Sequence, residues 1–489
     1  MHWTKSVSLA IRIRTLVGGS FEERGRAILA TSHFYPYEAG WAQSVGAGHR
    51  ATWDQWRGLS RSRKLWESAR RLLPLGIGSN ARFEQIYGSV DPPTRFIRSG
   101  EGPFVWDVDS HRLLDLHCGF GALSLGHAYP TFVDALNASL KEGIGPSYTH
   151  KGEFEAARCV RNWIPSMEMV RFCNSGTEAV VHAIRIARAC QDCRGIVKFE
   201  GHYHGQSDIG LLSVDPPLSR KHKARPIPDS PGLAQTADVA VARWNDMRSL
   251  EEAFRYLDGQ VAAVICEPIM GNFCATLPAP GFLRSVARFA RSSGALVIFD
   301  EVKTAIRLGK DGVHERYGVR ADLTAASKSI SNGFPVGVLG GRAALMQRIR
   351  PGGIAHGGTY ASNPLATTAI VSTLTTLSAP KKLDRMFAWG RALQEIYRRA
   401  FERNNLSFTV QGIPTMFQTV PTREGELTSY LDKRRVSPAS YGRLHRSMLR
   451  AGVLIPADWE ECQSVSLSHC DVDLGALESI VNRGVALSA

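Results

Sequence analysis

Short apolar segments alternate with helical segments from about residue 130 onward, and this alternation most restricts the fold of the chain. Apolar segments of five or six residues recur at 195–199, 261–266 and 295–299. Segments with apolar residues at helical spacing occupy 131–141, 178–189 and 282–291. Strands of this length separated by helices are typical of a parallel sheet covered by helices. We therefore expect an α/β protein that binds its ligand at the carboxyl ends of the strands.

Composition excludes several classes of partner. Lys and Arg exceed Asp and Glu by 59 − 45 = 14, but the excess is spread along the chain, so we expect an anionic small molecule rather than nucleic acid. The nine cysteines are scattered, as is typical of free thiols in a reducing compartment. No apolar run is long enough for a transmembrane helix. We expect a cytoplasmic protein, with organelle targeting by the basic N-terminal residues as the alternative.

Two residues of complementary chemistry follow neighbouring strand-like segments. Asp300 comes directly after 295–299, and Lys328 comes just after the next strand-like stretch. A pyridoxal phosphate (PLP) site needs such a pair. The lysine forms a Schiff base with the aldehyde, and the carboxylate keeps the ring nitrogen protonated so that the ring takes up electrons. Asp and Lys are common residues, so the prediction depends on what surrounds them.

A phosphate site is predicted where a strand at 170–173 leads into the helix at 178–189. Ser175, Gly176 and Thr177 lie in this turn. Glycine permits close approach of the backbone, the hydroxyls add donors, and a helix N-terminus favours an anion. Ser and Thr are also ordinary helix caps, so the local pattern leaves both interpretations open.

The segment 201–205 follows another strand and offers an aromatic side chain and two histidines. Tyr203 is placed to stack on a pyridine ring. The alternative is a metal site formed by His202 and His204, but no partner ligand stands at a recognisable spacing, so we expect no metal. Glu267 follows the strand at 261–266, where it either faces the ligand or is a hydrogen-bonded loop carboxylate.

Together these motifs resemble the class III, fold-type I aminotransferases, which depend on PLP, and within them the branch of glutamate-1-semialdehyde 2,1-aminomutases. The resemblance covers about residues 60–480 and rests on Lys328 and on the segments 174–179, 201–205, 267–272 and 299–302. It implies a mostly parallel central sheet covered by helices, with a smaller C-terminal α/β domain. The expected divisions are a basic extension over 1–60, a segment joining the small domain over 61–115, a large PLP-binding domain over 116–365 and a small domain over 366–489.

The resemblance also implies a role for each matching residue. Lys328 would be the Schiff-base lysine and proton shuttle, and Asp300 would pair with the pyridinium nitrogen. The other implied cofactor-binding residues are Ser175, Gly176 and Thr177 at the phosphate, Tyr203 on the ring, and His204 and Asn272 nearby. Thr359 would reach the phosphate of the partner subunit, which implies a homodimer. The implied substrate-binding residues are Ser79, Arg82, Phe120 and Glu267, although Arg82 has the alternative of a structural surface arginine.

The sequence departs from the mutase motifs on the substrate side. Asn80 replaces a proline, Phe120 replaces a tryptophan, and Lys303 replaces the methionine of Asp-Glu-Val-Met-Thr-Gly-Phe-Arg. A glycine-rich loop becomes 327–333. These changes favour a divergent aminotransferase that moves an amino group between an amino donor and a carbonyl acceptor. The alternatives are the intramolecular mutase reaction and a catalytically idle binding protein with the same fold.

Overall fold

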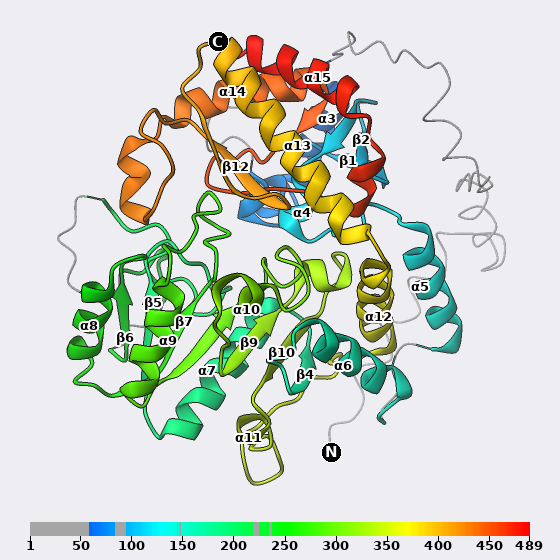
Figure 1. The fold of residues 1–489 in the computed structure, drawn as a ribbon. Helices are drawn as coiled ribbons and strands as arrows, with labels where there is room; N and C mark the ends of the chain where they lie inside the picture. The colour runs from blue at the N-terminus through cyan, green and yellow to red at the C-terminus, as the bar shows by residue number, and fades with distance from the viewer. Residues whose placement is uncertain (1–57, 84–93, 144, 146–147, 219–223, 234–236) are drawn as a thin grey trace, which may run out of the picture. The chain divides into compact units, whose positions relative to one another are not determined.

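The computed structural model describes residues 58–489 apart from gaps at 84–93, 144, 146–147, 219–223 and 234–236 (Figure 1). The expected N-terminal extension over 1–60 therefore lies outside the described residues, except for its last three. Within the described part of the chain, no helix is long and apolar enough to cross a membrane.

A seven-stranded sheet lies at the centre of the larger part of the molecule (Figure 1). Its strands are β4 (Met169–Cys173), β5 (Gly195–Phe199), β6 (Val239–Ala242), β7 (Val261–Cys266), β8 (Leu296–Asp300), β9 (Leu323–Ala326) and β10 (Gly337–Gly341). They are arranged in the order β4-β10-β9-β8-β7-β5-β6, and β10 runs antiparallel to both of its neighbours while the other pairs are parallel. The expected mostly parallel sheet is confirmed, and β10 is a reversal that the sequence pattern did not predict.

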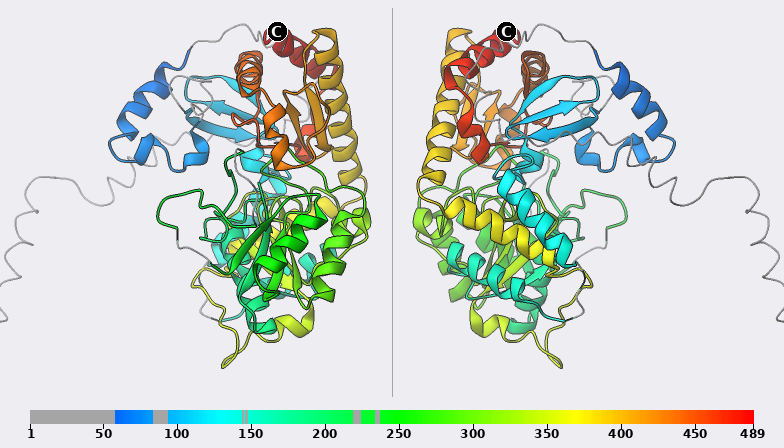
Figure 2. Two further views of the ribbon diagram at one scale, coloured as in Figure 1. Left: turned by 90° about the vertical axis from the view of Figure 1, so that its left-hand side faces the viewer. Right: turned by 90° about the vertical axis from the view of Figure 1, so that its right-hand side faces the viewer.

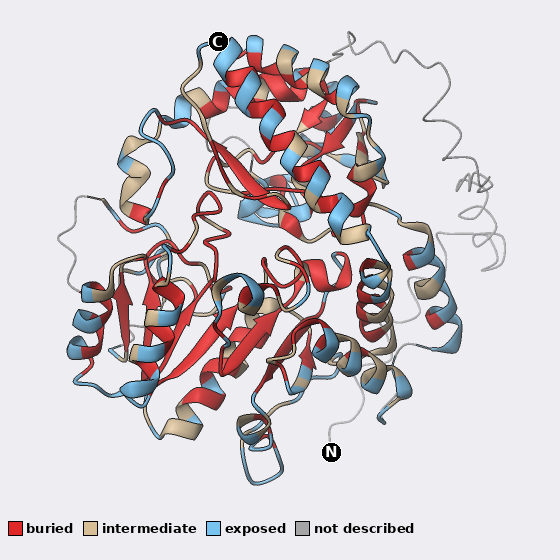
Figure 3. Cartoon of the chain, in the orientation of Figure 1, coloured by how far each residue is buried: buried red, intermediate tan, exposed pale blue. Residues whose placement is uncertain are grey.

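Helices cover both faces of this sheet. Helix α7 (Gly176–Gln191) packs on one face, and α8 (Met247–Tyr256) and α9 (Phe282–Ser292) pack on the other. Side chains alternate along a strand, so Ile298 packs with α7 while Val297 packs with α8 and α9. Figure 3 shows the consequence, with buried strands between helices that are exposed only on their outer sides. Burial on both faces explains why the sequence of each of these strands is a continuous run of apolar residues.

Three further helices pack together beside the sheet. Helix α12 (Pro364–Ser378) lies against α5 (Pro130–Glu142) and α6 (Lys151–Trp163). Proline occupies the first turn of both α5 and α12, where its missing N–H has no intrahelical partner to lose. The side chain of Asn363 caps α12 by accepting a hydrogen bond from the Ala366 N–H at 3.0 Å. The sequence predicted α5 to within one residue at each end.

The smaller part of the molecule combines segments from both ends of the described chain. One sheet joins β1 (Ile97–Glu101), β2 (Phe104–Asp107) and β3 (Arg112–Asp115) to β13 (Val453–Leu454), and a second joins β11 (Thr409–Ile413), β12 (Met416–Val420) and β14 (Gln463–Ser464). The long helices are α13 (Lys382–Arg403), α14 (Pro438–Ala451) and α15 (Leu474–Ala486). Both views of Figure 2 show β1 to β3 beside these C-terminal elements. The expected smaller α/β unit is present, and its boundaries at residues 115 and 365 stay predictions.

Candidate active site

Loops that leave one edge of the seven-stranded sheet carry most of the predicted site residues. Asp300 is the last residue of β8, and Lys328 begins the short helix η4 (Lys328–Ser331) just after β9. The parallel register of the two strands places Asp300 opposite Ala325, so both strands end together. Ser175 follows β4 and Tyr203 follows β5, which run in the same direction and therefore reach the same edge.

Asp300 is buried and accepts two hydrogen bonds. His204 Nδ1 donates to Asp300 Oδ2 at 2.8 Å, and the Val302 N–H donates to Oδ1 at 3.1 Å. Burial lowers the pKa of His204 well below its ordinary value, so the ring is neutral and its Nδ1 carries the proton. Burial also raises the pKa of Asp300 to about 7. A cation bound against this carboxyl group would favour its charged form.

The two histidines of the 201–205 loop have separate partners. His202 Nδ1 accepts a hydrogen bond from the Glu267 N–H at 3.0 Å, whereas His204 is bonded to Asp300. The Nδ1 atom of each histidine is thus engaged by a protein group. Among the described residues, one group has ligand atoms close enough to share a metal ion, namely Asp311, His314 and Glu315. The guanidinium of Arg320 already donates to Asp311 Oδ2 at 3.0 Å, so this carboxylate has a positively charged protein partner.

The amine of Lys328 is half-buried and has no hydrogen-bond partner in the described part of the chain. Burial, together with the charge of Lys303, lowers the pKa of Lys328 to about 8. At neutral pH a larger fraction of Lys328 than of an ordinary lysine is therefore in the neutral, nucleophilic form. Lys328 also has a φ of 50°, in the left-handed region, and such backbone strain often marks functional sites.

The residues that depart from the glycine-rich motif hold the Lys328 loop in place. Asn332 Oδ1 accepts hydrogen bonds from the N–H groups of Ser124 and Leu125 at 3.0 and 2.9 Å, and its Nδ2 donates to Gly126 O at 3.1 Å. Ser124 Oγ donates to Ser329 O at 2.7 Å. Asn332 has a φ of 47°, which asparagine tolerates better than most residues. Asn332 therefore fixes the loop through side-chain hydrogen bonds that a glycine could not make.

The N-terminus of α7 forms a cradle that suits an anion. Ser175 caps the helix by accepting a hydrogen bond from the Glu178 N–H at 3.1 Å, which leaves its hydroxyl proton able to donate. A Cβ at Gly176 would lie 2.7 Å from Val302 Cγ2, and a Cβ at Gly205 would lie 2.5 Å from Thr177 Oγ1. There is thus no room for a side chain at Gly176 or at Gly205. The first N–H groups of the helix have no intrahelical acceptor and are free to bind an anion.

Glu267 connects the loops that carry Tyr203 and Asn272. It accepts hydrogen bonds from the Tyr203 N–H at 3.0 Å, the Gly271 N–H at 2.8 Å and Asn272 Nδ2 at 3.4 Å. Burial and the charge of Asp300 raise the pKa of Glu267 to about 7. Gln206 Nε2 donates to the Tyr203 hydroxyl at 2.7 Å and so restrains the aromatic ring. Glu267 is therefore a hydrogen-bonded loop carboxylate that lies next to Tyr203 and Asn272, two of the predicted cofactor-binding residues.

The remaining predicted residues are less closely joined to this cluster. Ser79 and Arg82 are exposed at the short helix η2 (Asn80–Arg82), and no hydrogen bond of the described chain links them to Lys328 or Asp300. Thr359 is exposed as well, and the neighbouring Gly358 lies beside the phosphate segment, with its Cβ position 3.7 Å from Asn174 Nδ2. Their roles toward substrate and partner subunit stay predictions.

Phe120 lies in a turn with unusual backbone geometry. The residues from Cys118 to Gly121 all have positive φ, with 59° at Phe120, a conformation that costs about 1–2 kcal/mol per non-glycine residue. The Phe120 ring stands edge-on to His117, with their centroids 4.2 Å apart. Buried Arg307 holds the turn by donating to Gly121 O at 2.7 Å.

The sequence analysis assigned no role to three residues at this edge, namely His117 beside Phe120, Arg307 at the same turn, and Glu461. Lys303 was noted as a departure from the mutase motif, but its ion pair with Glu461 at 2.5 Å was not predicted. A signal existed for Lys303 and Arg307, because both fall within eight residues of a buried strand end at Asp300. Charged residues so close to a buried strand end must be paired or solvated.

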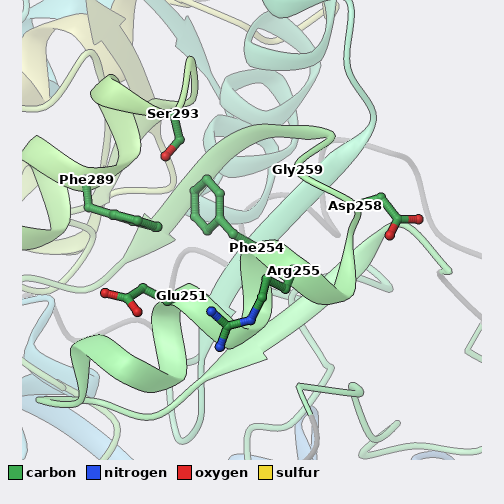
Figure 4. Close-up of a pocket in the computed structure, with 7 residues that line it drawn as sticks. All are labelled: Glu251, Phe254, Arg255, Asp258, Gly259, Phe289 and Ser293. Carbon is green, nitrogen blue, oxygen red and sulfur yellow. The ribbon is translucent and has the colours of Figure 1, made fainter.

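A surface groove of about 590 Å³ lies apart from these residues, between α8 and α9 (Figure 4). Phe254 and Phe289 pack edge to face in it, with ring centroids 4.9 Å apart. The groove is lined by Glu251, Phe254, Arg255, Asp258, Gly259, Phe289 and Ser293. None of the predicted site residues contributes to it, so we assign it no part in the chemistry.

Comparison with known proteins finds relatives over most of the chain. Residues 87–437 match the family model for class-III aminotransferases, a range that includes every predicted site residue except Ser79 and Arg82. The glutamate-1-semialdehyde 2,1-aminomutase of Thermomicrobium roseum is 36% identical over 431 residues, which cover 88% of this chain and 98% of the relative.

Two solved structures are similar over the same extent. An omega-transaminase from Sphaerobacter thermophilus matches with a TM-score of 0.80 and 28% identity, covering 87% of this chain and 97% of its own. A β-phenylalanine aminotransferase from Variovorax paradoxus matches with a TM-score of 0.76 and 27% identity, covering 87% and 93%. The sequence relative and the structural neighbours thus carry out different named reactions.

Proposed function

We infer the function of this chain from its family, because it belongs to the class III aminotransferases, which are PLP-dependent enzymes. We propose that it transfers an amino group between an amino donor and a carbonyl acceptor. One observation carries the proposal. The unbonded Lys328 amine, the Asp300–His204 pair and the N-terminus of α7 meet at one edge of the sheet, each on a different strand end.

The residues present fit PLP. The N–H groups at the start of α7, with Ser175 and Thr177, would hold the phosphate, and Asp300 would hold the protonated ring nitrogen. When bound, the cofactor supplies an aldehyde that condenses with amines and a ring that takes up electron density from the substrate carbon. Tyr203 would lie against the ring, with Asn272 nearby. Thr359 would reach the phosphate of the partner subunit in a homodimer.

Lys328 and Asp300 would be the catalytic residues. Lys328 would hold the cofactor through its amine and, as a free amine, would accept the proton of the substrate carbon as a general base. A lowered pKa favours this role, because the amine must be neutral to accept the proton. His204 keeps Asp300 oriented through its 2.8 Å hydrogen bond, so that the carboxylate charge faces the ring nitrogen.

Ser79 and Arg82 would orient a carboxylate or another polar group of the substrate. A guanidinium binds a carboxylate through two parallel hydrogen bonds, which fixes direction as well as position. Phe120 and Glu267 would face the substrate from the other loops. Because Arg82 is exposed, its contribution would be to substrate affinity rather than to the reaction step.

The second candidate is the intramolecular reaction of glutamate-1-semialdehyde 2,1-aminomutase. It is favoured by a relative of that name that is 36% identical over 98% of its length. The transferase is favoured by the changes at Phe120, Lys303 and 329–332, which fall on the substrate side of Lys328. The low pKa of Lys328 and the hydrogen-bonded Asp300 support an enzyme over an idle binding protein.

One experiment separates the two reactions. The PLP-loaded protein is incubated with single amino donors and no acceptor, and both the cofactor spectrum and the released carbonyl product are measured. Conversion of the cofactor to its amino form, with one carbonyl product per site, supports the transferase. Turnover of glutamate semialdehyde alone, with no reaction of any other donor, would instead establish the mutase.

A further inference from the structure

A buried ion pair links the loop after β8 to the C-terminal segment near β14. Lys303 Nζ lies 2.5 Å from Glu461 Oε1 and donates to Gly271 O at 2.9 Å. The side chains of Lys303 and Glu461 are only 5% and 13% exposed. Glu461 Oε1 also accepts a hydrogen bond from the Cys462 N–H at 3.1 Å. Charges with so little exposure need paired partners, so the contact is part of the structure of the site.

The backbone around the pair is shaped to admit the lysine side chain. A Cβ at Gly271 would lie 2.6 Å from Lys303 Cδ and 3.1 Å from Glu267 Oε2. Gly271 therefore lets the lysine stem cross the loop that Glu267 holds. The carbonyl of Gly271 is shared, because Cys462 Sγ also donates to it at 3.1 Å. The loop after β7, the loop after β8 and the C-terminal segment meet at this point.

Lys303 and Lys328 follow neighbouring strands that end together, because β8 pairs with β9 and Asp300 lies opposite Ala325. Burial opposes the charge on Glu461, but the charges of Lys303, Lys328 and His117 act in the other direction and lower its pKa. Burial likewise opposes the charge on Lys303, and Glu461 raises its pKa, so both members are ionised. The charged groups that act on Lys328 are Lys303, Glu461, Glu267 and Asp300.

We propose that Lys303 is a positioning residue that holds Glu461 and cancels its charge, so that the Lys328 amine experiences the field of an ion pair rather than that of a lone carboxylate. This inference rests on the proposed function of Lys328. A lone carboxylate would stabilise the protonated form of any nitrogen at Lys328, and a lone ammonium would disfavour it. The pair leaves the nitrogen able to lose and regain a proton, as transfer of the substrate proton requires.

The test compares four forms of the PLP-loaded protein: wild type, Lys303→Met, Glu461→Gln and the double variant. Methionine is a neutral side chain of similar length, and glutamine keeps the shape of glutamate. The pH midpoint of the visible absorbance change reports protonation of the nitrogen at Lys328. Lys303→Met should raise this midpoint by about 1–2 pH units, since the uncompensated Glu461 carboxylate then acts on it.

Glu461→Gln should move the midpoint in the opposite direction. The fall should be smaller than the rise, because unpaired Lys303 is buried and releases its proton more readily. The double variant should return close to wild type, and Lys303→Arg should restore the wild-type midpoint by keeping the charge. A merely structural role would not produce shifts of opposite sign.

The possible failures are distinguishable. If wild type takes up no PLP, the proposed function itself is wrong. If wild type and variants bind PLP, melt at similar temperatures and titrate at the same pH, Lys303 does not act on Lys328. If both single variants shift the midpoint in the same direction, the loss of packing rather than charge explains the effect, and the inference is also overturned.

Discussion

The residues proposed to face the cofactor and those proposed to face the substrate are held in different ways. Asp300, His204 and Ser175 lie at strand ends or a helix N-terminus and are fixed by hydrogen bonds of 2.8 to 3.1 Å. On the substrate side, Arg82 is exposed and Phe120 lies in a left-handed turn. A rigid sheet edge can thus preserve the cofactor chemistry while loops change the substrate.

The largest expected effect is on the cofactor-facing half. Asp300→Asn should lower the rate of amino transfer by about 10³-fold, because a neutral amide does not hold a positive charge on the ring nitrogen. The rate is measured as the half-reaction with an amino donor. A cofactor analogue methylated on its ring nitrogen carries that charge permanently, and it should restore part of the rate. An unchanged rate in Asp300→Asn would remove Asp300 from the mechanism.

The next effect concerns the pH dependence of cofactor uptake. Burial and Lys303 lower the pKa of Lys328 to about 8, so about 300-fold more free amine is present at pH 7 than for a lysine of pKa 10.5. The rate at which the cofactor-free protein takes up PLP should therefore rise with pH, reach half of its maximum near pH 8 and level off above that pH. A rate that continues to rise beyond pH 10 would mean that Lys328 titrates as an ordinary lysine.

A smaller effect tests the phosphate cradle. Ser175→Ala should weaken PLP binding about tenfold, or ~1.4 kcal/mol, because the hydroxyl donor is lost. It should also lower the free energy of unfolding by about 1 kcal/mol, because α7 loses its cap. The matched control is Asp473→Ala, which removes the cap of α15, where Asp473 accepts from the Ala476 N–H at 2.7 Å. If both variants weaken PLP binding equally, Ser175 acts only as a cap.

An effect of similar size is expected on the proposed substrate-facing half. Arg82→Ala should raise KM for a carboxylate substrate about tenfold and leave kcat nearly unchanged, as expected for a charged hydrogen bond that only positions the substrate. Arg71→Ala, which removes another exposed arginine of the same segment, should change neither constant. Equal effects of the two variants would indicate that the Arg82 charge acts only at long range.

The sequence predicted some elements better than others, for physical reasons. β5 and β7 were predicted at their observed bounds because strands buried on both faces are continuous apolar runs. β10 was missed because three of its five residues are glycine, which has low strand propensity. Its reversed direction depends on tertiary packing that no local pattern records.

The same distinction applies within the site. The segments around Ser175, Tyr203, Asp300 and Lys328 were recognisable because each is a short run of residues at a strand end. The Lys303–Glu461 pair joins residues 158 positions apart, so only the fold brings the two charges together. Neither residue has a neighbour in sequence that indicates its partner.

The most direct test of the central proposal is to identify the residue that binds the cofactor. The protein is loaded with PLP, reduced with borohydride and digested, and its peptides are analysed by mass spectrometry. We expect the reduced cofactor on Lys328, and none on the nearby Lys303, whose ammonium is held by Glu461. Failure to bind PLP, or attachment to Lys303 or another lysine in place of Lys328, would contradict the proposed site.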